Sequence, residues 1–366
     1  MKICYVSSVL SIHDIRFFDK FLERNYKVDV VSFNNNRPDK HRHGITYHNF
    51  PISGHNKLST SINIAKSIIF LKKLLRKINP DVLHGGFIQM DGFISALTNY
   101  HPFLLMPWGS DVLILPKKSI LSKIFAKYTI QKADMITCDA EFVKKAIIKL
   151  KNYPEDKIIV FPYGIDLKKF NPNVDGSKIR TKLGWNDKKI LIMTRFFKPI
   201  YGIEYFLNAF VDIIHEIPEV RVILCGDGPL KNNYLKFVSE NNLNEYVFFA
   251  GHVQNDELPN YLNAADIYVS SSLSDGTSLS LLEAMACGLP TIVTDVPAIM
   301  EWVQDGKNGF VVPRKDSVIL AEKIIQMLQD ETLQKNFGNE NIKIAKERAD
   351  WDKNFGKLER IYKSLI

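Results

Sequence analysis

The sequence predicts an α/β protein with two parallel, doubly wound sheets. Apolar runs of strand length alternate with amphipathic runs of helix length from one end of the chain to the other. The alternation restarts after a cluster of turn-forming residues, Pro162, Gly164, Pro172, Gly176 and Gly184. With 366 residues, the chain is also longer than one compact core usually requires. Together these observations predict two domains, each a parallel sheet with helices on both faces.

Strand-like runs in the first half of the chain begin at the N-terminus. They are MKICYVSS, YKVDVVSF, DVLHGG, FLLMPWG, ADMITCD and KIIVFPYG. Amphipathic runs such as HDIRFFDKFLER and AEFVKKAIIKL fall between several of them and predict helices. His13 and Asp14 interrupt the first apolar run early, which favours a first strand over a signal peptide.

The second half repeats the pattern. Its strand-like runs are KKILIMTR, EVRVILCGDG, YVFFAGHV, ADIYVSSS, LPTIVTD and NGFVVP. IEYFLNAFVDIIHEI and DELPNYLNAAD predict helices between them, and the C-terminal run predicts a helix that breaks near Ala349–Asp352. No apolar run in the sequence has the length of a membrane span.

Charge divides the chain into two unlike halves. Residues 1–175 hold 26 Lys and Arg against 15 Asp and Glu, whereas the remainder holds 22 against 25. The basic first half predicts an anionic partner, for which nucleic acid and an anionic membrane surface are the candidates. Residues 59–78 predict a helix with a lysine-rich face, and further lysines follow between residues 117 and 132. A lysine-rich composition without any partner is the alternative.

The four cysteines are scattered, with no metal-binding or redox spacing. They are typical of buried thiols in a reducing compartment, which favours a cytoplasmic protein. The sequence also lacks a metal-ligand cluster, so we expect no metal site.

The stretch 270–290, SSSLSDGTSLSLLEAMACGLP, is the most informative segment. Asp275 and Gly276 lie in a serine-rich loop, and a predicted helix follows with Glu283 inside it. Glycine allows a ligand to approach the backbone, the helix N-terminus suits phosphate, and a carboxylate can bind a vicinal diol. The pattern therefore suits a nucleotide-sugar, although a solvated loop acid and an ordinary helix glutamate would give the same spacing.

Arg195 lies directly after a predicted strand, where ligands bind in open α/β folds. Its guanidinium can bind a diphosphate bidentately, and Lys198 would add a second charge. Gly226 and Gly228 follow the next strand but lack the third glycine of a dinucleotide fingerprint, which argues against a nicotinamide or flavin enzyme. They favour close passage of a nucleotide, or a plain tight turn. The loop at Val253 is a weak candidate for contact with a base.

Acceptor-side candidates come from the first half. Trp108 offers an apolar face for a sugar ring, and Asp111 could bind a hydroxyl or act as a base. A buried tryptophan and a helix-capping aspartate would explain the same residues. His13 also lies near a predicted strand end, although a lone histidine is weak support for a site.

Taken in order, several segments resemble the family 4 retaining glycosyltransferases of group 1. They are PDVLHGGF, MPWGSDVL, ADMITCDAEFVKKAI, KIIVFPYGIDLKKFNP, ILIMTR, VILCGDGPL, GHVQNDELPNYLNAADIYVSSS, DGTSLSLLEAMACGLPTIVTDVPA and DGKNGFVVP. The resemblance implies a GT-B fold with two Rossmann-like domains facing a central cleft. It assigns residues 1–168, with a C-terminal helix at 351–366, to an acceptor-side domain, and residues 169–350 to a nucleotide-sugar-binding domain.

The resemblance also implies roles for the candidate residues. Arg195 would bind the donor diphosphate, Asp275 the sugar hydroxyls and Glu283 the ribose. Backbone amides between Gly276 and Ser280 would contact the sugar and phosphates, and Val253 would border the base. The segment that would supply these amides consists of Gly276, Thr277, Ser278, Leu279 and Ser280. The family retains the anomeric configuration and needs neither metal nor cofactor.

The chain departs from the family pattern at four places. Asp275 replaces the usual glutamate, and Tyr201 stands where a lysine is usual, so that Lys198 is a candidate replacement. The frequent Gly-Gly turn near the N-terminus is absent, and His13 is a candidate to occupy its space. Trp108 replaces a frequent histidine.

The resulting hypothesis is a cytoplasmic glycosyltransferase, peripheral on the inner face of a membrane. It would transfer a sugar from a UDP- or GDP-sugar to a glycan or lipid-linked acceptor, in surface polysaccharide or lipopolysaccharide synthesis. Two rivals are a nucleotide-sugar epimerase of the same fold and a non-catalytic basic module that binds membrane or other polyanions. Because no segment resembles a nucleic-acid motif, we expect no nucleic-acid partner. The sugar, the base, the acceptor and the oligomeric state stay open.

Overall fold

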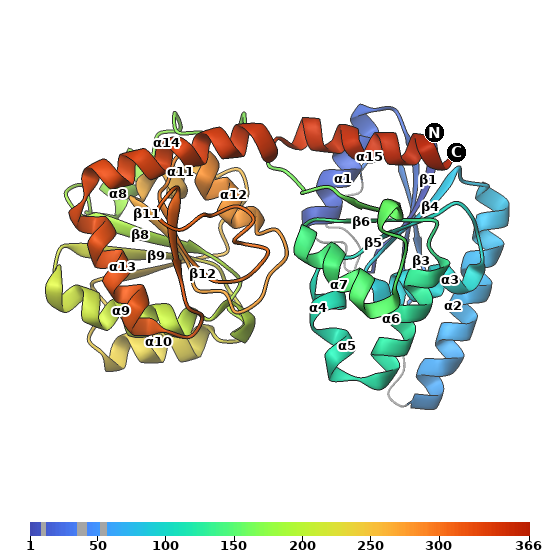
Figure 1. Cartoon of the computed structure of the whole chain (residues 1–366), viewed down its shortest axis with the longest axis horizontal. Helices are drawn as coiled ribbons and strands as arrows, with labels where there is room; N and C mark the ends of the chain where they lie inside the picture. The colour runs from blue at the N-terminus through green and yellow to red at the C-terminus, as the bar shows by residue number, and fades with distance from the viewer. Residues whose placement is uncertain (9–11, 35–41, 52–56) are drawn as a thin grey trace. The chain divides into compact units, whose positions relative to one another are not determined.

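The computed structural model describes residues 1–8, 12–34, 42–51 and 57–366 (Figure 1). The chain forms two compact units. The first comprises Met1–Phe161 together with Phe355–Ile366, and the second comprises Pro162–Asn354.

The first unit contains a sheet of seven parallel strands in the order β3-β2-β1-β4-β5-β6-β7. These strands are β1 (Lys2–Val6), β2 (Lys27–Ser32), β3 (Ile45–Asn49), β4 (Val82–Gly86), β5 (Phe103–Met106), β6 (Met135–Cys138) and β7 (Ile158–Val160). The six predicted strands are confirmed. β3 was missed because this edge strand, ITYHN, is only partly buried and therefore has no apolar run.

Helices flank this sheet. They are α1 (Ile12–Glu23), α2 (Lys57–Ile78), the π-helix η1 (Ile88–Gly92), α3 (Phe93–Thr98), α4 (Ser110–Leu113), α5 (Leu115–Lys118), α6 (Ile120–Lys132), α7 (Glu141–Lys151), the 3-10 turn η2 (Glu155–Lys157) and, from Phe355 onward, α15 (Trp351–Leu365). The rings of Phe355 and Tyr362 on α15 pack against Phe21 of α1. The Tyr362 hydroxyl also lies 2.5 Å from Nδ1 of the buried His84 on β4. The C-terminal helix is therefore part of the first unit's core.

The second unit contains a sheet of six parallel strands in the order β10-β9-β8-β11-β12-β13. Its strands are β8 (Lys189–Thr194), β9 (Val220–Cys225), β10 (Val247–Gly251), β11 (Ile267–Ser270), β12 (Thr291–Thr294) and β13 (Gly309–Val312). Its helices are α8 (Ser177–Leu183), the 3-10 turn η3 (Pro199–Tyr201), α9 (Ile203–Glu216), α10 (Lys231–Glu240), α11 (Leu258–Ala264), α12 (Leu279–Ala286), α13 (Ser317–Gln329) and α14 (Glu331–Arg348). The predicted strands are confirmed, and so is the helix break between Arg348 and Trp351.

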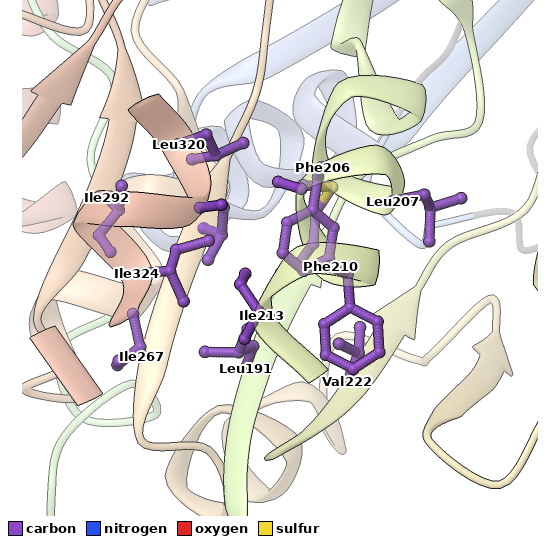
Figure 2. Close-up of a cluster of buried hydrophobic side chains, with 14 of the residues drawn as sticks. Leu191, Phe206, Leu207, Phe210, Ile213, Val222, Ile267, Ile292, Leu320 and Ile324 are labelled. Atoms are coloured by element: carbon purple, nitrogen blue, oxygen red, sulfur yellow. The ribbon is translucent and has the colours of Figure 1, made fainter. Parts of the chain in front are cut away.

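Two apolar cores cover the two faces of the second sheet. One of them packs Leu191 of β8 against Phe206 and Phe210 of α9 and Ile324 of α13 (Figure 2). The other contains Tyr268 of β11 and the inner side of α12. Because both faces are buried, these strands are almost continuously apolar, which is why their sequence runs were easy to recognise.

In both sheets the order of strands reverses at one point. In the first unit the reversal lies between β1 and β4, and in the second between β8 and β11. At such a point the loops after the two strands leave toward opposite sides, which opens a place for a ligand beside their carboxyl ends. The fold therefore predicts that the loops after β8 and β11 form a site.

Candidate active site

Arg195 and Asp275 meet at the strand-order reversal of the second unit. Arg195 follows β8, and Asp275 lies in the loop between β11 and α12. An Nη2 hydrogen of Arg195 is donated to Oδ2 of Asp275 at 2.5 Å, and the two side chains are only 9% and 18% exposed. The sequence analysis predicted both residues, and the structure brings them into contact.

The Arg195 guanidinium has three kinds of neighbour. Besides Asp275, Nη2 donates to Oγ of Ser278 at 2.5 Å, and the Tyr201 ring centroid lies 4.9 Å from Cζ. Burial acts to lower the pKa of Arg195, but the charge of Asp275, the nearby Tyr268 and Tyr201, and the hydrogen bond to Asp275 together outweigh it and raise the pKa above its ordinary value. The buried Nε finds no acceptor among the described residues. A buried cationic donor without a partner costs free energy, so an anion that reached it would be bound strongly.

The first turn of α12 is tied to this arginine. Ser278 is the N-cap residue, and its Oγ accepts a hydrogen bond from the Leu281 amide at 3.3 Å. Ser280 lies next to it, with Oγ 3.3 Å from that of Ser278, and accepts a hydrogen bond from the Tyr268 hydroxyl at 3.0 Å. The guanidinium therefore lies against the amino end of a helix, whose partial positive charge also favours anions.

The other candidate residues of this loop and helix follow Asp275 in the sequence. Gly276, Thr277 and Ser278 are buried, and Leu279 and Ser280 are partly buried. Glu283 is buried in the middle of α12. Its predicted contact with a ribose stays a prediction.

The structure gives Gly226 and Gly228 a clear structural role. A Cβ on Gly226 would lie 1.9 Å from the carbonyl oxygen of Arg195, and one on Gly228 would lie 2.7 Å from that of Phe197. The Phe197 amide also donates to the carbonyl of Asp227 at 2.7 Å. The two glycines thus allow the loop after β9 to pack against the loop that carries Arg195. Their contact with a donor stays a prediction.

Tyr201, not Lys198, is the residue placed against Arg195. Lys198 is exposed, with Nζ 5.0 Å from the centroid of the Phe196 ring, and it makes no ion pair with any residue in the described part of the chain. From the sequence Tyr201 was only a departure from the family pattern, and its contact with the guanidinium could not be predicted. Val253 lies after β10, partly buried against the core that contains α12.

Asp111 is fully buried in the first unit and holds two loops together. Its Oδ2 accepts from the Ile88 amide and its Oδ1 from the Trp108 amide, both at 3.0 Å. Burial raises the pKa of Asp111 to about 6, against the lowering effect of these hydrogen bonds. The carboxylate thus has a structural role, and its contact with an acceptor stays a prediction. Trp108 is partly buried, with its ring edge-on to Phe17, and the side chain of His13 lies outside the described residues.

The sequence analysis missed a buried pair at the strand-order reversal of the first unit. Ser8 follows β1, and Asp91 lies on η1 after β4. Oδ2 of Asp91 accepts from the Ser8 amide at 2.9 Å, and Oδ1 accepts from the Ser8 hydroxyl. Burial raises the pKa of Asp91 to about 7 against these bonds, and the charge of Asp14 adds to the rise. The position of Asp91 five residues after the strand-ending Gly86 was the available signal.

This pKa shift predicts a loss of stability as the pH rises. Because the pKa of Asp91 is higher in the folded chain than in the unfolded one, its contribution is complete below about pH 4 and is lost as the pH rises through about 7. We expect Asp91→Asn to reduce the change in Tm between pH 5 and pH 8 by roughly 5 °C. Thermal unfolding of both proteins by circular dichroism measures this change, and a Tm difference that is constant over the pH range would contradict the prediction.

Two further features of the described residues bear on function. No group of three or more His, Cys, Asp or Glu side chains among them could hold a metal ion. In the same part of the chain, no helix combines the length and the apolarity that a membrane crossing requires.

Comparison with known proteins agrees with this architecture. Residues 175–344 match the family described as glycosyl transferases group 1, and residues 2–140 match the family described as glycosyl transferase 4-like. An uncharacterised glycosyltransferase of Methanocaldococcus jannaschii is 28% identical over 365 residues, which cover 98% of this chain and 92% of that protein. The alpha-monoglucosyldiacylglycerol synthase of Acholeplasma laidlawii is 30% identical over 207 residues, covering 55% of this chain and 51% of the synthase.

Among solved structures, Anabaena HepE in complex with UDP matches with a TM-score of 0.82 at 20% identity, and all of both chains is covered. The two Rossmann-like α/β units of this chain have the GT-B fold of that structure. The chain belongs to the family 4, group 1 glycosyltransferases.

Proposed function

We propose that this glycosyltransferase moves a hexose-like sugar from a UDP- or GDP-sugar to a glycan or lipid-linked acceptor, with retention of configuration and without a metal or cofactor. The proposal rests chiefly on the surroundings of the Arg195 guanidinium. It is buried, held by Asp275 and Ser278 at the amino end of α12, and has an Nε without a partner among the described residues. A diphosphate is the dianionic group that such a position suits.

Each donor-side residue has a chemical role in this proposal. Arg195 and the α12 amides neutralise the diphosphate and the charge that develops on it as the sugar leaves. Asp275 accepts hydrogen bonds from the sugar, and Glu283 accepts them from the ribose. The loops at Val253 and Gly226–Gly228 border the base. Because a guanidinium and a helix N-terminus provide the positive charge, no divalent cation is needed for departure.

Retention follows from attack on the face that the leaving group occupies. The bond between the anomeric carbon and the phosphate oxygen breaks, and a new bond forms to the acceptor oxygen. The acceptor proton passes to the departing phosphate oxygen. This scheme needs no nucleophile from the protein, and acceptor contacts would come from the first unit, with Trp108, Asp111 and His13 as candidates.

The names of the similar proteins support the substrate classes. HepE was crystallised with UDP, and the A. laidlawii relative synthesises a glucosyl lipid by its name. A lipid-linked acceptor agrees with the basic first half of the chain, in which residues 1–175 hold 26 Lys and Arg against 15 Asp and Glu. We place the enzyme on the inner face of the membrane, in the synthesis of surface polysaccharide or lipopolysaccharide.

A donor screen tests the proposal. Purified protein is mixed with UDP-, GDP- and ADP-sugars in excess chelator, with and without a lipid extract, and the products are measured by mass spectrometry. We expect one donor to release free nucleotide, more so with the extract, and Glu283→Ala to abolish the release. An activity that appears only after a divalent metal is restored would contradict the metal-independent mechanism.

The same screen separates the two rival functions. An isomerised nucleotide-sugar without nucleotide release would identify an epimerase. Salt-sensitive binding to polyanions, with no turnover and no effect of Glu283→Ala, would identify a basic binding module.

A further inference from the structure

Three large apolar side chains are exposed together at the start of α6. Ile120, Leu121 and Ile124 are 79%, 63% and 54% exposed. With about 3.6 residues per turn, these three positions share an arc of about 100°. The opposite side of α6 is buried in the first unit through Ala126, Thr129 and Ile130. Exposed apolar residues are ordinary when they are scattered singly, but a cluster of this kind marks an interaction surface.

Lysines precede this cluster and lie beside it on α6, and the segment contains no acidic residue. Lys117 and Lys118 end α5, and Lys123 and Lys127 lie on α6, all with exposed side chains. Residues 112–133 contain no Asp or Glu. None of the four lysines forms an ion pair with a residue that the structure describes. Within the described part of the chain, no acidic side chain therefore neutralises their positive charge through an ion pair.

The combination of apolar and cationic groups identifies the kind of partner. Apolar side chains can enter the boundary between headgroups and acyl chains, while lysines remain at the level of the anionic headgroups. Nucleic acid would contact the lysines but would leave the three apolar side chains in water. A symmetric dimer formed through this surface would place the lysines of one copy against the same lysines of the other. Charge complementarity thus favours an anionic lipid surface.

We propose that α5 and the first turns of α6 form the membrane-docking surface of this enzyme, with Ile120, Leu121 and Ile124 inserted among anionic lipids. Figure 1 shows both helices in the first unit, and α5 at its lower end in that view. This surface would make the membrane contact that the proposed function requires, so its biological purpose rests on that function. Lipid binding itself needs no donor or turnover.

Vesicle cosedimentation tests the surface directly. Full-length protein is incubated with vesicles of phosphatidylcholine alone, or of phosphatidylcholine mixed with phosphatidylglycerol, at low and high salt. We expect binding to the anionic vesicles only, weakened by salt. The triple substitution I120S, L121S and I124S should reduce the bound fraction at least tenfold, and K117E, K118E and K123E should do the same.

Matched variants in the second unit control for composition and charge. V318S removes an apolar side chain that is 62% exposed, and K178E, K182E and K335E repeat the charge change at exposed positions of α8 and α14. These variants should bind vesicles as the unaltered protein does. Circular dichroism must show that every variant is folded.

Three results would overturn the proposal. The first is no binding of the unaltered protein to anionic vesicles, and the second is equal binding by the patch variants. The third is a dimer in sedimentation equilibrium that the apolar substitutions dissociate, which would assign the surface to a second copy. Nucleotide release from a water-soluble donor is measured separately and should be unchanged in the patch variants, so failure of the transferase proposal and failure of the docking surface are distinguishable.

Discussion

Replacing Arg195 with Ala is expected to lower turnover by at least tenfold, and by about a hundredfold if the guanidinium contacts the leaving oxygen. The reason is that Arg195 is the buried cation beside the amino end of α12, already oriented by Asp275, Ser278 and Tyr201. Orientation before the reaction means that little reorganisation is needed when charge develops on the diphosphate. Steady-state release of nucleotide from the donor found in the screen measures the effect.

Arg221→Ala is the matched control for this variant. Arg221 also stacks on a tyrosine, with Cζ 4.5 Å from the Tyr246 ring centroid, and also has a buried Nε without a partner among the described residues. It lies at the amino end of β9, however, whereas Arg195 follows the carboxyl end of β8. Only the carboxyl end is a ligand edge, so Arg221→Ala should keep near-normal turnover. Near-normal turnover in Arg195→Ala would overturn the assignment of the site.

Arg195→Lys is informative as well. Lysine keeps one positive charge but lacks the planar fork that binds two oxygens at once. If charge alone were needed, this variant would recover most of the turnover. We expect it to remain closer to Arg195→Ala.

Asp275→Asn should impair use of the sugar while leaving nucleotide binding intact or tighter. Oδ2 of Asp275 lies 2.5 Å from Nη2 of Arg195, and a diphosphate must compete with this carboxylate for the guanidinium. Removing the negative charge removes the competitor, but it also removes the proposed acceptor for sugar hydroxyls. We therefore expect kcat to fall about tenfold or more, with the Kd for free UDP or GDP unchanged or lowered.

Calorimetric titration with the free nucleotide and steady-state kinetics with the donor measure the two effects. Asp295→Asn is the control, since Asp295 follows β12 and pairs with Arg314 at 2.8 Å in a more exposed ion pair. That variant should change neither quantity. Equal losses of nucleotide binding and turnover in Asp275→Asn would contradict the proposal that Asp275 serves the sugar and is not needed for binding the nucleotide.

The accuracy of the sequence analysis depended on burial. Strands such as Ile190–Met193 are apolar on both faces because both are covered, so their pattern is visible in the sequence. The edge strand Ile45–Asn49 was missed because its side chains are only partly buried and need not be apolar. Arg195 and Asp275 were predictable as neighbours because each follows a strand, and the carboxyl ends of parallel strands meet at one edge of the sheet.

Other parts of the site could not be predicted in this way. The stacking of Tyr201 on Arg195 depends on a turn, Pro199–Tyr201, that brings the ring back over the guanidinium. The pairing of Ser8 with Asp91 joins residues 83 positions apart, so the sequence shows that Asp91 follows a strand end but not that Ser8 is its partner. Asp111 was a plausible base by sequence, yet the amides of Ile88 and Trp108 occupy its two oxygens.

The sequence alone therefore determined the α/β class, the parallel strands and the family, because these depend on local periodicity and on motifs in a fixed order. Only the tertiary structure decided which polar groups are satisfied and which are not. Hydrogen bonding and burial depend on residues brought together from distant parts of the chain. They distinguish the Nε of Arg195, which has no partner among the described residues, from the Asp111 carboxylate, whose two oxygens each accept a backbone hydrogen bond. The same holds for the exposed cluster on α6, since exposure is a property of the folded surface.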